Sequence, residues 1–195
     1  KKRFFQLIYE AGRYSYFLMF LIAFPIILEA EYILKLWLVE VPAYTVLFTR
    51  FVLASALYRI IVRSTINGVH ATGDVKTLNL TSGVYSACSF LPLVYILFKC
   101  GLPVWSCFIV YAFNGIVCNF FEARALYKRE RFDILRYITY VYLHPIAVSI
   151  IAAILPFVIT ITIEESFLRL LLTLIVNSLC TLICVYTLGI NQDAR

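Results

Sequence analysis

Two arginines, Arg59 and Arg63, lie one helical turn apart inside a long apolar stretch of the sequence. Ser55 and Asn67 continue the series at four-residue spacing, which places all four side chains on one face of a helix. An arginine near the bilayer centre costs about 2.5–3.5 kcal/mol on insertion scales, so two of them are not expected to face lipid. We predict that they line a watery cavity and bind an anion. Snorkelling to the head groups and pairing with acids on neighbouring helices are the alternatives.

The composition indicates an integral membrane protein. The chain is 63% hydrophobic and 16% aromatic, with only 14% charged residues, whereas soluble proteins carry about 25% charged residues. The six cysteines form no Cys-x-x-Cys pair, so neither disulfides nor a metal site is predicted. Met19 is the single methionine, and we expect the chain to be a piece of a longer protein.

Six apolar runs are candidates for membrane spans, each of which needs about 20 residues. They cover residues 14–28, 43–68, 80–98, 104–127, 137–161 and 167–188. The first run is short, and its hydrophobicity resumes over residues 32–38, either as an interfacial piece or as an extension of a tilted helix. The short connections predict one all-α lobe over residues 1–195 with no soluble domain. The centre of the second run places Arg59 about 5–6 Å to the cytoplasmic side.

Basic residues gather on every second side of the predicted bundle. They occur at residues 1–3 with Arg13, at His70 and Lys76, and most densely over residues 124–136. The positive-inside rule then places both ends of the chain in the cytoplasm. The 124–136 cluster is a topology determinant or a site for anionic lipid head groups. The acidic residues are assigned to the connections, with no acid pair at mid-membrane depth.

Two further polar residues inside the spans are weaker candidates for a site. Asn114 in the fourth run is either a bridge between helices or a ligand contact. His144 in the fifth run is either a packing residue or a proton-sensitive group. The sequence carries no phosphate-binding loop, hydrolase elbow or metal-binding histidine pair. We therefore predict no enzymatic activity, no cofactor, no metal ion and no nucleic-acid partner.

A set of hydrophobic motifs extends over most of the chain. They are Ile33–Leu38 with Pro42, Asn67-Gly68, Ala71–Lys76, Leu91–Tyr95, Gly101 and Leu188-Gly189. In these motifs the chain resembles the C-terminal half of a polysaccharide-repeat flippase of the O-antigen (Wzx) type. This family belongs to the superfamily of multidrug, oligosaccharidyl-lipid and polysaccharide exporters.

The resemblance implies a transporter of about twelve helices, in which this six-helix lobe faces a missing N-terminal lobe across a central cavity. The implied cargo is an undecaprenyl-pyrophosphate-linked oligosaccharide, flipped across the bacterial inner membrane by alternating access. Other polysaccharide-assembly membrane proteins are possible partners. The alternatives are a multidrug or small-molecule exporter of the same superfamily, a membrane-embedded polysaccharide transferase or polymerase, and a membrane scaffold without transport.

Overall fold

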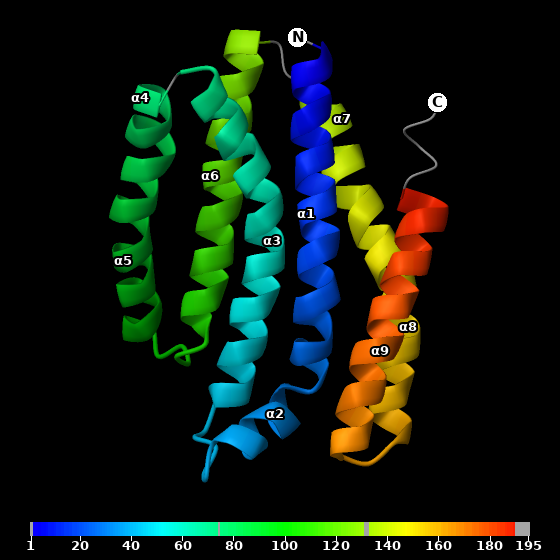
Figure 1. The fold of residues 1–195 in the computed structure, drawn as a ribbon. Helices are drawn as coiled ribbons and strands as arrows, with labels where there is room; N and C mark the ends of the chain where they lie inside the picture. Colours follow the sequence, from blue (N-terminus) through cyan, green and yellow to red (C-terminus); the bar gives the residue numbers. More distant parts are fainter. Residues whose placement is uncertain (1, 74, 131–132, 190–195) are drawn as a thin grey trace. The chain divides into compact units, whose positions relative to one another are not determined.

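The computed structural model describes residues 2–73, 75–130 and 133–189. Three residues used in the charge and family arguments, Lys1, Asp74 and Arg131, lie outside the described residues, as do the side chains of Lys2 and Arg129. Every element in the described part is a helix (Figure 1). In chain order they are α1 (Lys2–Leu28), α2 (Ala30–Trp37), α3 (Thr45–Ala71), α4 (Val75–Leu78), η1 (Asn79–Gly83), α5 (Val84–Lys99), α6 (Ser106–Glu130), α7 (Ile134–Tyr137), η2 (Ile138–Leu143), α8 (His144–Thr162), α9 (Phe167–Cys184) and η3 (Val185–Gly189).

Six helical stretches of the described residues are long and apolar enough to cross a membrane. They are Arg3–Leu28, Thr45–Ala71, Asn79–Lys99, Ser106–Lys128, Ile134–Thr162 and Phe167–Leu188. Each overlaps one of the six predicted runs, so the prediction of an all-α, multi-pass membrane protein is confirmed. The sequence could predict these six helices because the thickness of the bilayer sets a minimum length for a spanning helix, and an apolar run of that length can be recognised from hydrophobicity alone.

The first span differs most from its prediction. It begins at Arg3 rather than near residue 14, because no helix-breaking residue interrupts the chain before Pro25. Arg13, expected to flank the span, lies inside α1 with only 2% of its surface exposed. The apolar segment after Glu29 is a separate helix, α2, which turns away from the axis of α1 (Figure 1).

The chain divides into two compact units. The first contains the residues up to Gly12 together with Ile61–Tyr137. The second contains Arg13–Ile60 and the residues from Ile138 onward. Helices α1 and α3 each contribute one end to either unit. The prediction of a single lobe over residues 1–195 stays a prediction.

Close packing around Gly68 holds the first unit together. A Cβ atom added at Gly68 would lie 2.7 Å from Cδ1 of Ile8 and 3.3 Å from Cδ1 of Leu126, so the absence of a side chain lets these helices approach. Nearby, Tyr137 is 1% exposed, and its hydroxyl contacts both the Thr65 hydroxyl and the Ile61 carbonyl oxygen. The first unit therefore combines an apolar contact with buried hydrogen bonds.

In the second unit, α8 and α9 form an antiparallel pair joined by a short connection (Figure 1). The N-cap of α9 is Ser166, whose hydroxyl oxygen accepts a hydrogen bond from the Arg169 backbone N–H at 3.1 Å. The π-helical turn η2 directly precedes α8, where Pro145 occupies the first turn. Because proline has no N–H to donate, the regular α-helical ladder cannot continue unchanged into this position.

Candidate functional site

The predicted arginine stripe lies on α3, which runs without a break from Thr45 to Ala71. Along it Ser55 is half-buried, whereas Arg59, Arg63 and Asn67 are exposed. The buried face of the helix is made by other residues, namely Ile61, Val62, Ser64, Thr65, Gly68 and Val69. The stripe is therefore directed away from the packed face of its own helix.

The depth of the arginines differs from the estimate made from sequence. The helix has 27 residues and its midpoint is Tyr58. At 1.5 Å per residue, Arg59 lies about 1.5 Å and Arg63 about 7.5 Å along the axis from that midpoint. The sequence estimate was larger because the predicted span ran from residue 43 to residue 68, whereas the helix begins at Thr45 and continues to Ala71. Arg59 is thus one residue from the middle of the helix, where a lipid-facing charge is least favourable.

The two weaker candidates lie on other elements. Asn114 on α6 is 4% exposed, and its Oδ1 lies 2.7 Å from the Ser89 hydroxyl oxygen of α5. Asn114 therefore bridges two helices, which was one of its two expected roles. His144 is half-buried at the first position of α8. The role of both residues as ligand contacts stays a prediction.

A second polar stripe, missed in the sequence, runs along the buried face of α9. Its members are four residues apart: Arg169, Thr173, Asn177 and Thr181. Asn177 is fully buried, and its Nδ2 donates to the Leu21 carbonyl oxygen of α1 at 3.0 Å. The four-residue spacing was visible in the sequence, but burial was needed to separate this stripe from a solvated face.

Arg169 and Glu29 form a buried ion pair at one end of this stripe. Arg169 donates from Nε to Oε1 of Glu29 at 2.9 Å and from Nη2 to Oε2 at 2.7 Å. Its Nη1 donates to the Ile163 carbonyl oxygen at 3.0 Å, and the Thr173 hydroxyl lies 3.2 Å from Oε1 of Glu29. The bidentate geometry satisfies both carboxylate oxygens. Glu29 lies in the connection between α1 and α2, as the sequence indicated, but at 1% exposed it is a buried partner rather than a surface residue.

Glu122 is an acid that the sequence argument misplaced. It lies within the fourth span, on α6, and only 5% of its surface is exposed. The assignment of all acids to the connections was therefore wrong for this residue. The available signal was its position inside the predicted run 104–127, eight residues after Asn114 and so on the same helical face.

A cavity of about 360 Å³ lies beside the ion pair in the second unit. It is lined by Ile27, Leu28, Glu31, Tyr32, Arg50, Phe157, Thr160, Glu165 and Arg169. Two acids and two arginines line it, so it carries no excess of positive charge toward an anion. Arg50 donates from Nε to the Ile27 carbonyl oxygen at 3.1 Å.

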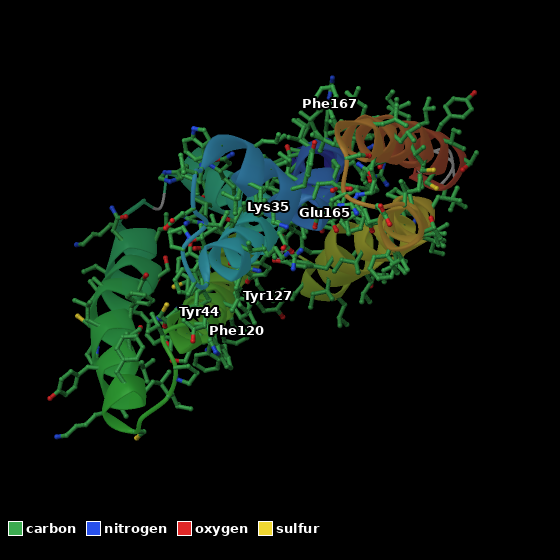
Figure 2. The ribbon with its side chains drawn as sticks, turned by 90° about the horizontal axis from the view of Figure 1, so that it is seen from below. Lys35, Tyr44, Phe120, Tyr127, Glu165 and Phe167 are labelled. Atoms are coloured by element: carbon green, nitrogen blue, oxygen red, sulfur yellow. The ribbon has the colours of Figure 1, made fainter. Side chains whose placement is uncertain are left out.

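Lys35 bridges two acids at the rim of this cavity. Its Nζ lies 2.9 Å from Oε1 of Glu31 and 2.9 Å from Oε2 of Glu165, and Figure 2 shows Lys35 and Glu165 side by side. The hydrogen bond from Lys35 lowers the pKa of Glu31, and the hydrogen bonds to Glu31 and Glu165 raise the pKa of Lys35. All three side chains are largely exposed, so the bridge contributes little to stability.

No protein family, curated protein or solved structure matches this chain. The candidate site therefore rests on its residues and their positions.

Proposed function

We propose that the chain is one lobe of a membrane transporter that flips a lipid-linked anionic oligosaccharide across the cell membrane. The observation that carries the proposal is the pair of exposed arginines near the middle of α3. A cation at that depth needs water, an anion or an acid nearby. A central transport cavity that admits an anionic cargo would supply both water and an anion to these arginines.

The chemistry of the arginines favours a phosphate-bearing head group. A guanidinium presents a planar fork of N–H donors that matches two phosphate oxygens, and it stays charged at any physiological pH. Arg59 and Arg63 lie one turn apart, which suits a pyrophosphate with two neighbouring anionic groups. The resemblance to O-antigen flippases points to the same class of cargo, and its undecaprenyl tail would remain in the bilayer during transport.

The proposed mechanism is alternating access. The proposed central cavity between this lobe and the second lobe opens to the cytoplasm, and Arg59 and Arg63 bind the head group. The two lobes then rock to expose the head group on the opposite side of the membrane. A multidrug exporter of the same superfamily remains the alternative transporter, but cationic drugs would be repelled by the arginine stripe. A transferase is the other alternative. It would need an accessible catalytic acid, and the exposed acids at the cavity, Glu31 and Glu165, are both paired with Lys35.

Substitutions at two arginines of α3 test the proposal. Arg59→Lys keeps the charge but loses the bidentate fork, so partial transport is expected. Arg59→Ala removes a charge-assisted hydrogen bond worth about 1.5–3 kcal/mol, which corresponds to roughly 10- to 150-fold weaker binding. Arg50→Lys is the matched control, because Arg50 lies near the start of α3, far from the helix midpoint.

Two measurements complete this test. The first is surface polysaccharide in cells that depend on this protein, compared at equal protein level in the membrane. The second is binding of a pyrophosphate-linked oligosaccharide lipid to the purified full-length protein. Export by Arg59→Ala at the wild-type rate, with unchanged binding, would show that the arginine does not contact the cargo.

A further inference from the structure

In the first unit a polar seam runs between α6 on one side and η1 with α5 on the other. It is formed by Asn114, Cys118 and Glu122 of α6, Ser82 of η1 and Ser89 of α5. Asn114, Cys118 and Glu122 follow one another at four-residue spacing on α6, and therefore share one face. Asn114 accepts a hydrogen bond from Ser89, as described above. The Cys118 thiol lies 3.5 Å from the Ser82 carbonyl oxygen, and the Ser82 hydroxyl is the hydrogen-bonding neighbour of the Glu122 carboxyl group. In Figure 1, α5 and α6 lie side by side along this seam.

One oxygen of the Glu122 carboxyl group lacks a hydrogen-bond donor, and the described residues offer one hydroxyl to the group as a whole. Its Oε2 atom is buried and has no hydrogen-bond partner among the described residues. The Ser82 hydroxyl also lies 2.9 Å from the Leu78 carbonyl oxygen, so its one proton is shared between that carbonyl and the carboxyl group. Burying an ionised carboxylate without donors or a counter-charge costs several kcal/mol. A protonated carboxyl group avoids this cost, and it can donate its own proton.

The described neighbours supply no counter-charge. Lys76 on α4, Lys99 on α5, and Arg63 and His70 on α3 are exposed. Arg124 and Lys128 on α6 itself are exposed as well. Other titratable side chains of the first unit include Tyr85, Cys88 and Tyr95 on α5 and Arg3, Tyr9 and Glu10 at the start of α1. The titratable group that interacts with Glu122 is the Cys118 thiol, one turn away on α6 itself. No positive charge therefore balances Glu122 within the described residues.

The backbone opposite Glu122 is irregular. Ser82 belongs to the π-helical turn η1, Asn79–Gly83, at the start of the third span. Single π-helical turns inside membrane helices occur often at functional sites, because they release backbone carbonyl groups from the regular ladder. Here the Ser82 carbonyl oxygen faces the Cys118 thiol. Asn114 adds a second buried and unpartnered polar atom, its Nδ2, on the same face of α6.

We propose that Glu122 is a proton-binding site within the membrane and that loss of its proton opens the seam between α5 and α6. In the closed seam the carboxyl group holds the proton. When the O–H bond dissociates, the proton passes to water entering the seam, and the carboxylate left behind is hydrated. The site depends only on residues of the first unit, so it stands whether or not the proposed cargo is correct.

Infrared spectroscopy of the purified full-length protein in lipid tests the protonation state directly. We expect a protonated-carboxyl C=O band at neutral pH that disappears in Glu122→Gln and persists in Glu40→Gln, a control on an exposed acid. Ser82→Ala should shift the frequency of this band, because the carboxyl group loses its neighbouring hydroxyl. The site is refuted if the neutral-pH spectrum is the same in the wild type and Glu122→Gln, or if the band does not move in Ser82→Ala.

Thiol accessibility tests the opening of the seam. Two variants retain only Cys118, or only the exposed Cys88 of α5 as a control for the ordinary pH dependence of thiol reactivity. With a small thiol reagent, the rate of Cys118 modification relative to Cys88 should rise several-fold as the pH increases. With Glu122→Gln in both backgrounds the rise in this ratio should be clearly smaller, because only the difference in burial between the two thiols then remains. An equal pH response with and without Glu122 would refute the link between proton loss and opening.

Discussion

Removing the Arg169 side chain should lower the stability of the protein more than removing one partner of an exposed ion pair. Arg169→Met replaces the guanidinium by an unbranched apolar side chain and leaves Glu29 buried. Glu29 then loses the donors to both carboxylate oxygens and keeps only the Thr173 hydroxyl, 3.2 Å from Oε1. At 1% exposed, its carboxylate cannot turn to water without moving the helices around it.

The expected magnitude follows from this burial. Breaking a buried ion pair by removing one partner costs about 3–5 kcal/mol, because the remaining charge is uncompensated. For a chain of this size, 1 kcal/mol shifts Tm by about 2–4 °C, so Arg169→Met should lower Tm by roughly 6–20 °C. Glu29→Gln with Arg169→Met should recover part of this loss, since neither side chain then carries a buried charge.

The pair of Lys35 and Glu165 is the matched control. Its atoms approach to 2.9 Å, against 2.7 Å for Arg169 and Glu29, but the two side chains are 50% and 39% exposed. Lys35→Met should cost less than about 1 kcal/mol, as exposed pairs do. The measurement is thermal unfolding of the purified full-length protein in one detergent, followed by circular dichroism. If Arg169→Met and Lys35→Met lower Tm equally, the reasoning from burial is wrong.

Three further outcomes are expected. Gly68→Ala should be about 1 kcal/mol less stable than Gly83→Ala in denaturant unfolding, because the Cβ at Gly68 would make the ends of the Ile8 and Leu126 side chains shift, whereas nothing lies within 4 Å of a Cβ at Gly83. Lys35→Gln should raise the pKa of Glu31 toward its ordinary value in an NMR titration; because the bridge lowers that pKa in the folded state, its small stabilising effect is present at neutral pH and is lost as the pH falls through it. An engineered cysteine at position 129 should react with an impermeant reagent only after cells are opened, and labelling from outside would reverse the predicted orientation.

Hydrophobicity alone determined the class of this protein. Six apolar stretches identified six spanning helices, because a backbone inside lipid must satisfy its own hydrogen bonds and an apolar helix does so. Four-residue spacing also placed Arg59 and Arg63 on one face of α3, since helical geometry fixes which side chains share a face. The ends of the spans were predicted less accurately than their number, as the first and second spans show. The start of α1 and the end of α3 depend on charged or polar residues that a helix tolerates at its ends.

Only the tertiary structure decided which polar residues are buried and what they contact. Glu29 and Arg169 are 140 residues apart, and nothing in the local sequence around either residue indicates the other. The spacing of Thr173 and Asn177 with Arg169 fits an exposed face as well as a buried one, and packing against α1 selects the buried one. Glu122 likewise became a candidate site only once its missing hydrogen-bond donors were known. The physical reason is that burial and partner choice arise from contacts between distant segments, whereas helix formation and membrane insertion arise from neighbours in the chain.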